Sequence, residues 1–422
     1  MATEAIRPAI MQEQYFDSHG HVWDRPCRPV CLSYRITGDL SVDALRGALA
    51  DLPVLHDALR WSFQVDGSRL TATIAESARI PLLVEDGSDL DAAMDRLHEA
   101  VVEAVHPAVA PMARAGLIRL GPADHVFVLA VDHRVADGRS ATRLLQDLCE
   151  RYDCHVRGAA EPPVVRAKQF SAWSVEQRET LDAAEMDRLV SYWRSHIGPT
   201  PEPARNPLPA FGQDATSNRL HTTRVELPPG FAASAGKFAA DHCVTPFAVY
   251  AGILLAATRS LSGADSCVIT MNCANRDLDE DDSVVGMCTT EIYVRTALHG
   301  DVAELAENFM ESLFDCLDHA NCPPRLLTRT VWPDADLYRQ GLLILATAAL
   351  DIPFPLTGVR AEPTAFRSES GMGASLLVRV LADQDPSVAL MHCSADADRI
   401  ETTEALGARY LAVAQELMRS VG

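Results

Sequence analysis

The side chains with the clearest potential for acid–base chemistry lie in the run DHRVADG at residues 132–138. A histidine exchanges a proton near neutral pH, so His133 is a candidate general base. Asp137, four residues later, can pair with a cation and fix the local backbone. Gly138 follows directly and permits close geometry where a helix begins. The run predicts proton transfer at His133, and a core or capping histidine stays open as the alternative.

Two regular elements must hold this run in place. Residues from His125 to Val131 are apolar and partly β-branched, as in a buried strand. Between Ser140 and Arg151, leucines recur on one helical face, at Leu144, Leu145 and Leu148. The segment from Asp132 to Arg139 is therefore predicted to be a strand-to-helix turn.

The rest of the chain alternates short β-branched runs with amphipathic segments, a pattern typical of layered α/β or α+β folds. Strands are predicted over residues 29–36, 219–227, 267–272 and 291–298. Ser41 is predicted to cap a helix whose apolar face carries Leu45, Leu49 and Leu52. Further helices are predicted over residues 170–197, 246–261 and 401–418, and the proline-rich stretch from Pro199 to Pro209 is predicted to be a surface linker.

Length and charge restrict the class of protein. The chain has 422 residues, more than a single core usually holds, so two lobes of about 200 residues each are expected. It is 48% hydrophobic and 23% charged, as in a globular protein. Its 37 basic and 58 acidic residues give a net charge of −21, which repels polyanions. We therefore expect no nucleic-acid partner.

Targeting and metal signals are weak. The start MATEAIRPAIMQEQ lacks the basic and apolar runs of an export signal, and the apolar stretches near residues 247–257 and 342–350 are too short to span a membrane. A cytoplasmic protein without a membrane segment is expected. Eleven cysteines indicate reduced thiols. Cys27-x-x-x-Cys31 and Cys149-x-x-x-x-Cys154-His155 lack a second cluster at zinc-site spacing, so no metal is predicted.

Two other motifs imitate functional sites. The tetrapeptide GADS at residues 263–266 resembles the phosphopantetheine attachment site of carrier proteins, but it lies between a predicted helix and strand. A tight turn is the predicted structure there. The acidic stretch from Asp277 to Asp282 lacks the glycine and the terminal glutamate of an EF-hand loop, so a solvated loop is predicted.

Six blocks, in order across nearly the whole chain, resemble the condensation domains of nonribosomal peptide synthesis, within the chloramphenicol acetyltransferase-like superfamily. The hallmark of that family is His-His-x-x-x-Asp-Gly, which residues 132–138 match except at the first position. The other blocks are AIMQEQ at 9–14, VLHDALRWSF at 54–63, SAW and SYW at 171–173 and 191–193, CVTPF at 243–247, and ANR followed by VGM at 274–276 and 285–287.

The resemblance implies a fold. It predicts two chloramphenicol acetyltransferase-like lobes of α/β layered structure, arranged as a V-shaped pseudodimer with a tunnel between them. The first lobe would cover residues 1–175 and carry the motif. The second would cover residues 176–422. One chain then contains both lobes, so a monomer suffices.

The resemblance also implies roles for the motif residues. His133 occupies the position of the second, catalytic histidine and would remove or position the proton of an attacking amine or hydroxyl. Asp137 would be structural and paired with an arginine such as Arg276. Gly138 would leave room, and a backbone N–H, near the developing oxyanion. Asn275 and Thr289 are weaker candidates for the tunnel.

One departure from the family pattern is Asp132, which replaces the first histidine. If its carboxylate faces the imidazole, it would raise the pKa of His133. If it points into the sheet, it needs a partner of its own. Arg134 does not have the spacing to Asp137 that would place an arginine at the catalytic position.

The resemblance predicts a free-standing condensation enzyme. It would join an acyl or aminoacyl thioester, delivered on the phosphopantetheine of a separate carrier protein, to an amine or alcohol, and it would bind no metal or nucleotide. Carrier proteins are commonly acidic, so Arg139, Arg143 and Arg151 are a candidate docking patch. A coenzyme A-dependent acyltransferase, a non-catalytic docking or recruitment domain and an epimerising relative are the alternatives.

Overall fold

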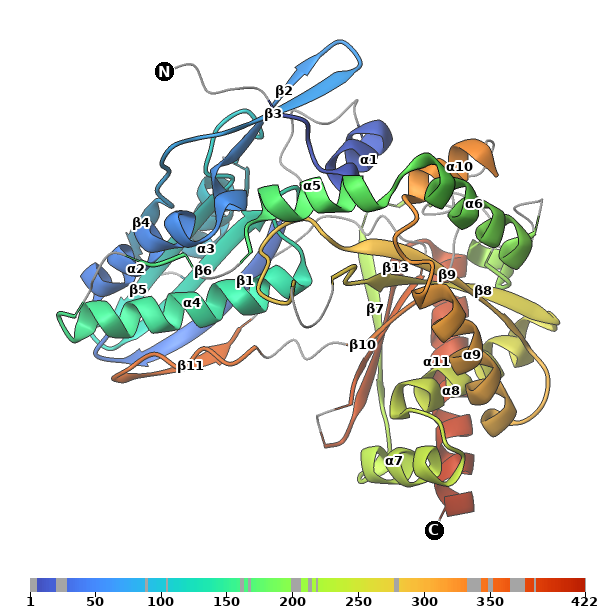
Figure 1. Cartoon of the computed structure of the whole chain (residues 1–422). Coiled ribbons are helices and arrows are strands. Elements are labelled where there is room, and N and C mark those ends of the chain that lie inside the picture. Colours follow the sequence, from blue (N-terminus) through green and yellow to red (C-terminus); the bar gives the residue numbers. More distant parts are fainter. Residues whose placement is uncertain are drawn as a thin grey trace. The chain divides into compact units, whose positions relative to one another are not determined.

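The structure is a computed structural model, and it divides the chain into two compact units (Figure 1). The first unit comprises Met1–Asp182, Ala274–Thr289 and Asp351–Ser368, and the second comprises Ala183–Cys273, Thr290–Leu350 and Glu369–Gly422. Within these bounds the structure describes residues 6–19, 29–87, 90–103, 105–159, 163–165, 168–198, 206–211, 215–217, 219–276, 281–331, 343–347, 352–364, 376–382 and 385–421.

The first unit is built on a five-stranded sheet in the order β11-β1-β6-β5-β4. Its strands are β1 (Pro29–Gly38), β4 (Leu82–Asp86), β5 (Ala113–Gly121), β6 (Asp124–Asp132) and β11 (Val359–Pro363). A separate hairpin pairs β2 (Trp61–Asp66) with β3 (Arg69–Ile74). The helices are α1 (Ile10–His19), α2 (Val42–Leu55), α3 (Leu90–His98), α4 (Gly138–Val156) and α5 (Phe170–Thr180), with short turns η2 (Asp57–Arg60) and η3 (Glu99–Glu103).

Strand β6 is apolar from Val126 to Val131, where helices cover both faces of its sheet. Phe127, Leu129 and Val131 lie in one buried cluster with the apolar faces of α2 and α4. Alternate residues Val126 and Val128 lie in a second cluster with α3. Successive side chains of a strand point to opposite faces, so a strand covered on both sides needs an uninterrupted apolar run. The buried strand predicted before the motif is confirmed.

The predicted capping of α2 is also confirmed. The Ser41 hydroxyl accepts the Ala44 N–H at 3.2 Å and thereby satisfies one of the unpaired donors of the first turn. Leu45, Leu49 and Leu52 of this helix are fully buried.

The second unit is built on a six-stranded sheet in the order β7-β13-β12-β10-β8-β9. Its strands are β7 (Leu220–Glu226), β8 (Ser266–Cys273), β9 (Thr290–Ala297), β10 (Leu343–Thr347), β12 (Leu376–Leu381) and β13 (Val388–Ser394). Its helices are α6 (Ala183–Ile197), α7 (Phe231–Asp241), α8 (Pro246–Ser262), α9 (Val302–Leu317), α10 (Pro324–Thr330) and α11 (Ala397–Val421), with a short turn η5 (Pro209–Phe211).

The sequence around α8 explains both of its ends. The Thr245 hydroxyl accepts the Ala248 N–H, and Pro246 opens the helix, where its missing N–H costs nothing. Gly263 closes the helix with a left-handed φ of 65°. The tetrapeptide that imitates a carrier attachment site is therefore the turn between α8 and β8, as predicted.

The structure corrects one predicted helix. Residues 170–197 form two helices, α5 and α6, because Leu181 leaves helical geometry at φ −93° and ψ 60°. The two units also divide here, at 182/183, whereas the sequence placed the boundary at 175/176. The predicted linker from Pro199 to Pro209 lies mostly outside the described residues.

The second half of the chain contributes two segments to the first unit. Ala274–Thr289 and Asp351–Ser368 belong to it, although the sequence-based division assigned all residues after 175 to the second lobe. Strand β11 pairs antiparallel with β1, with Ile36 opposite Ala361 (Figure 1). Such long-range pairing has no signal in local periodicity, so a continuous division could not detect it.

Among the described residues, no single helix is long and apolar enough to cross a membrane. Helices α7 and α8 meet the length and composition criteria only as a pair, and this pair is bent by 100° at its break.

Candidate functional site

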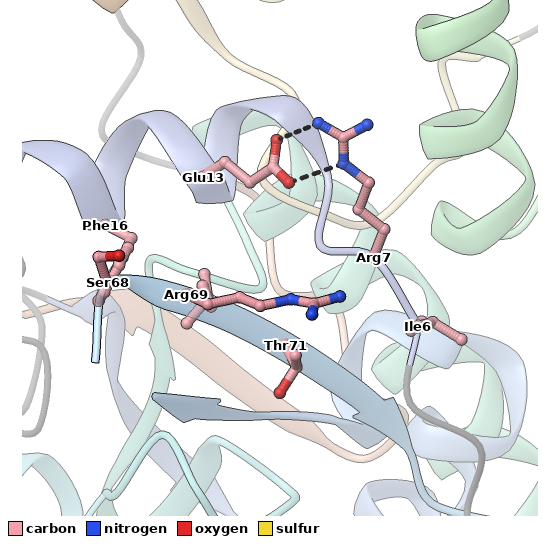
Figure 2. A pocket seen from close by; sticks show the side chains of 8 residues that line it. Ile6, Arg7, Glu13, Phe16, Ser68, Arg69 and Thr71 are labelled. Carbon is pink, nitrogen blue, oxygen red and sulfur yellow. Dashed lines mark hydrogen bonds and ion pairs between the residues drawn. The ribbon is translucent and has the colours of Figure 1, made fainter. Parts of the chain in front are cut away.

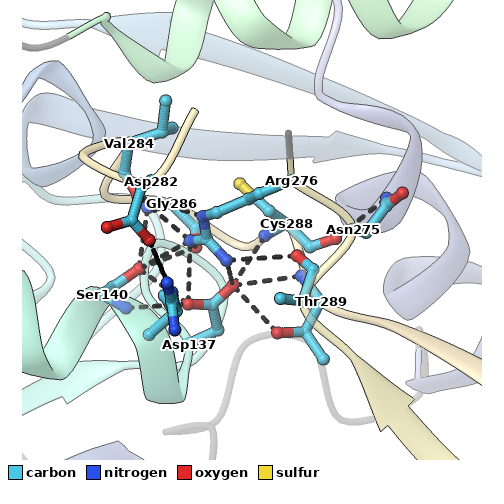
Figure 3. A network of polar contacts seen from close by, with 11 residues as sticks. Asp137, Ser140, Asn275, Arg276, Asp282, Val284, Gly286, Cys288 and Thr289 are labelled. Carbon is cyan, nitrogen blue, oxygen red and sulfur yellow. Dashed lines mark hydrogen bonds and ion pairs between the residues drawn. The ribbon is translucent and has the colours of Figure 1, made fainter. Parts of the chain in front are cut away.

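The carboxylate of Asp137 is the centre of a buried polar network in the first unit (Figure 3). As the N-cap of α4, it accepts the Ser140 N–H at 3.0 Å. It also accepts the N–H groups of Cys288 and Thr289 at 3.1 and 3.0 Å, and the Thr289 hydroxyl at 3.0 Å. One side chain therefore caps the helix after the motif and holds a segment about 150 residues later in the chain.

Arg276 completes the network as a two-pronged partner of Asp137. Its Nη1 and Nη2 each lie 2.9 Å from a different oxygen of the carboxylate, and the two side chains are 0% and 1% exposed. This is the ion pair that the family resemblance implied. Paired N–H···O bonds between a guanidinium and a carboxylate fix mutual orientation as well as charge.

Ionisation of both partners follows from this geometry. Burial opposes the charge on Asp137, but Arg276 and the hydrogen bonds from Ser140 outweigh it and hold the pKa of Asp137 below its ordinary value. Burial also opposes the charge on Arg276, yet the adjacent carboxylate raises the pKa of Arg276. The pair is therefore ionised on both sides at neutral pH.

Ser140 extends the network to Gly286. The Ser140 hydroxyl lies 2.9 Å from Asp137 Oδ1 and 3.0 Å from the Gly286 carbonyl, and it accepts the Gly286 N–H at 3.0 Å. A Cβ at Gly286 would lie 2.1 Å from the Phe170 ring, so only glycine fits without displacing that ring. Close packing and hydrogen bonds together fix this returning segment against the start of α4.

His133 lies in the turn between β6 and α4, at the place predicted from the sequence. Its ring is half-buried, and Nδ1 is buried without a hydrogen-bond partner among the described residues. The strand end at Asp132 and the helix cap at Asp137 fix both ends of this turn. The imidazole is thus held on a rigid scaffold, and no described residue binds its buried Nδ1.

Asp132 has a partner of its own, Arg134, as expected for the case in which its carboxylate does not face the imidazole of His133. Its carboxylate accepts Arg134 Nε at 2.8 Å, Arg134 Nη2 at 2.7 Å and the Arg134 backbone N–H at 2.9 Å. Both side chains are 1% exposed. In turn, Gln12 from α1 donates to the Arg134 carbonyl at 2.8 Å. The residue that replaces the first histidine therefore braces the turn through Arg134.

Gly138 has a role different from the one predicted. Its φ does not lie in the left-handed region, so the backbone at the start of α4 does not require glycine. A Cβ at this position would meet no atom within 4 Å, and the residue is exposed. The prediction that Gly138 is needed for tight backbone geometry is therefore wrong. The prediction that it leaves open space next to the motif agrees with the structure.

Several members of the network were missed or misplaced at the sequence level. Thr289 and Asn275 were candidates for a tunnel, but Thr289 binds Asp137, and Asn275 donates from Nδ2 to the Cys288 carbonyl at 3.1 Å. Asn275 also has a left-handed φ of 51°. Ser140 was not singled out, although a serine three residues after an N-cap aspartate is positioned to bind it.

The predicted arginine patch for carrier docking is not a free positive surface. Arg139, Arg143 and Arg151 each bind a carboxylate, which belongs to Asp282, Asp147 and Asp51, respectively. Arg143 and Arg151 are only 33% and 14% exposed. Asp147 lies one turn after Arg143 on α4, a pair that helix spacing can indicate, whereas Asp51 of α2 and Asp282 of the returning segment have no signal in the periodicity of α4.

No group of three or more His, Cys, Asp and Glu side chains in the described ranges is arranged to hold a metal ion. Cys149 and Cys154 are free thiols, and burial raises the pKa of Cys149 to about 12. Asp281 binds Lys168 at 2.8 Å. Cys27 and Asp277 lie outside the described residues.

The model of one protein family, the condensation domain, matches residues 17–344. Among curated proteins, the chain is 26% identical over 412 residues to CymA, a probable non-canonical nonribosomal peptide synthetase of Salinispora arenicola. That alignment covers 93% of this chain and 5% of CymA. The chain therefore spans about one twentieth of the length of this relative.

Solved structures share the fold over the whole chain. An X-domain from teicoplanin biosynthesis has a TM-score of 0.81 at 18% identity, covering 100% of this chain and 97% of that domain. The X-domain has also been solved in complex with OxyB. The SgcC5 protein from Streptomyces globisporus, solved in complex with an aryl ethanediol and sucrose, has a TM-score of 0.76 at 19% identity. The match covers 98% of this chain and 99% of SgcC5. The fold is that of the chloramphenicol acetyltransferase-like condensation domains.

Proposed function

This chain belongs to the condensation-domain family, and from that premise we propose that it joins an acyl or aminoacyl thioester, held on a carrier protein, to an amine or alcohol. The observation that carries the proposal is the state of His133. Its turn is fixed at both ends, and its Nδ1 makes no hydrogen bond to a described residue. A base with a fixed backbone and a free Nδ1 suits proton transfer to or from a bound substrate.

In the proposed reaction, a ring nitrogen of His133 accepts the proton of the attacking amine or hydroxyl. The nucleophile forms a bond to the thioester carbonyl carbon, which gives a tetrahedral intermediate. The carbon–sulfur bond then breaks, and the thiolate takes the proton back from the imidazolium. The products are an amide or ester and the free thiol of the carrier. Atoms and charge balance without a metal, nucleotide or bound cofactor.

Asp137 and Arg276 take no part in this proton transfer. Their ion pair is 0–1% exposed, and its donors and acceptors are engaged with the returning segment. Their role in the proposal is to hold the end of the His133 turn. Gly138 leaves open space beside that turn, which suits the approach of a substrate.

The test uses mass spectrometry to detect condensation products. Carriers loaded with a small panel of acyl and aminoacyl groups are mixed with amines and alcohols, and wild type is compared with His133→Ala. The expected loss of product in the variant is at least 100-fold, within the range of general-base contributions. His106→Ala, at an exposed histidine of the same unit, is the matched control. Equal product from wild type and His133→Ala would exclude His133 as the base.

Donor form is tested in the same assay. Supplying each acyl group on coenzyme A as well as on a carrier distinguishes the carrier-dependent reaction from a coenzyme A-dependent acyltransferase. Deuterium incorporation at the donor α-carbon without added nucleophile would indicate an epimerising reaction instead.

A second candidate function is recruitment of a partner protein. It is favoured by Asp132, which departs from the family motif, and by the likeness to an X-domain that has been solved in complex with OxyB. This candidate predicts no product with any donor. It also predicts that His133→Ala leaves partner binding unchanged, as measured by calorimetry.

A further inference from the structure

A cavity of about 410 Å³ lies in the first unit, between α1 and the β2–β3 hairpin (Figure 2). Its walls come from two short segments, one around Arg7 and Glu13 and one around Ser68 and Arg69. None of the lining residues belongs to the network around Asp137. The volume is within the usual range for small-molecule sites, about 300–1,000 Å³.

Backbone pairing holds the two walls together. The Ile6 N–H donates to the Ala72 carbonyl at 2.8 Å, and the Ala72 N–H donates to the Ile6 carbonyl at 3.1 Å. This isolated bridge ties the segment before α1 to β3. Hydrogen-bonded backbone therefore bounds the cavity at Ile6.

The charges around the cavity leave an excess of positive charge. The Glu13 carboxylate accepts Arg7 Nε at 2.9 Å and Nη2 at 3.3 Å, and it also binds Arg178 of α5 at 3.0 Å. Two guanidinium groups thus share one carboxylate. This excess stands out in a chain with a net charge of −21.

Arg69 adds a third guanidinium, and it has no partner among the described residues. Asp66 lies opposite Arg69 in the hairpin register, but the two side chains form no ion pair. The Ser68 hydroxyl beside it is likewise unengaged, whereas the Thr71 hydroxyl donates to the Gln64 carbonyl. In Figure 2 the Arg69 side chain runs along the hairpin beneath the Arg7–Glu13 pair.

The rest of the lining is apolar. Ile6, Phe16 and Leu70 contribute hydrocarbon surface next to these donors. Guanidinium groups match the geometry of carboxylate and phosphate oxygens. We propose that this cavity binds a small organic anion, with its carboxylate or phosphate on Arg69, Arg7 and Ser68 and its apolar body against Phe16 and Leu70.

Helix α1 connects this site to the motif turn. Glu13 and Phe16 line the cavity, and Gln12, adjacent to Glu13, donates to the Arg134 carbonyl at 2.8 Å. Gln12 also accepts the Ala9 N–H at 2.9 Å, which fixes its side chain at the start of the helix. The helix that lines the cavity is therefore the same helix that braces the turn carrying His133.

Binding is measured by isothermal titration calorimetry on the full chain with four probes. These are 4-phenylbutyrate, phenyl phosphate, the neutral 4-phenylbutyramide, and inorganic phosphate alone. We expect saturable binding of at least one of the two aryl anions, with the amide and inorganic phosphate at least 10-fold weaker. Which aryl anion binds more tightly distinguishes a carboxylate from a phosphate ligand.

Arg69→Ala is expected to weaken binding at least 10-fold, and Arg69→Lys less. Arg46→Ala, which removes the same charge from an exposed position on α2, is the matched control and should bind as wild type does. Because Arg69 and Arg46 are both exposed, all three variants should unfold at the same temperature as wild type. Equal binding by Arg69→Ala, equal binding of the neutral amide, or no saturable binding of either aryl anion would overturn the proposal. None of these outcomes depends on condensation activity.

Discussion

The carboxylate of Asp132 takes three hydrogen bonds from Arg134, two from the guanidinium and one from the backbone, with both side chains buried. The aspartate that departs from the family motif and the arginine two residues later therefore form one unit. Truncating Asp132 alone leaves a buried guanidinium without its carboxylate, which costs about 3–5 kcal/mol in comparable cases.

The first prediction follows from this pair. Asp132→Ala should lower the free energy of unfolding by about 3–5 kcal/mol, as measured by urea denaturation. Asp132→Ala combined with Arg134→Leu should lose less than the single variant, because both charges are then absent. Asp132→His, which restores the family residue, should destabilise as well. A double variant whose loss equals the sum of the two single losses would contradict the coupling.

The second prediction concerns the pH dependence of Asp137. Its lowered pKa means that the ionised form stabilises the folded chain above the ordinary value of 3.8, and this stabilisation disappears as the pH falls through the lowered pKa. The free-energy difference between wild type and Asp137→Asn should stay constant from neutral pH to about pH 4, then shrink. Asp39→Asn, at an exposed position, should show little difference at any pH. Urea denaturation at a series of pH values measures both.

The third prediction contrasts two glycines, beginning with Gly286. A methyl group there would press on the Phe170 ring, so Gly286→Ala should destabilise by about 1–3 kcal/mol in thermal or urea unfolding. Adding Phe170→Leu should recover part of that loss. An unchanged unfolding midpoint for Gly286→Ala would show that the ring moves aside freely.

The fourth prediction concerns Gly138, where open space surrounds the missing side chain. Gly138→Ala should leave stability unchanged or raise it by about 0.4–1 kcal/mol, because alanine favours the helix. Gly138→Leu should keep the unfolding temperature and reduce kcat/KM for condensation, because its side chain would occupy the open space at the start of α4, at the end of the turn that carries His133. Full activity in Gly138→Leu would show that substrates do not use this space.

Local sequence signals predicted the elements that hold the motif. The apolar run before Asp132 located β6, because helices cover both faces of that strand. The leucine spacing after Ser140 located α4. The same approach merged α5 with α6, since the break at Leu181 is a change of two backbone angles within an amphipathic pattern.

Contacts between distant parts of the chain had to come from the family resemblance or from the structure. Nothing near Asp137 indicates that its partner is Arg276, 139 residues away. The carboxylates that neutralise Arg139 and Arg151 also come from other segments, so the helix after the motif was wrongly predicted to be a free basic surface. The cavity beside α1 depends on a hairpin that periodicity did not reveal.

The return of residues 274–289 and of β11 to the first unit bears on how the chain acquires its structure during synthesis. A ribosome that has released only residues 1–182 has made neither Arg276 nor the edge strand that pairs with β1. At that stage the Asp137 carboxylate lacks Arg276 and the N–H groups of Cys288 and Thr289, so the nascent first unit cannot reach its final stability. The first unit can therefore complete its structure only after residues near 363 have been made, and the second unit only after β13 and α11 have followed.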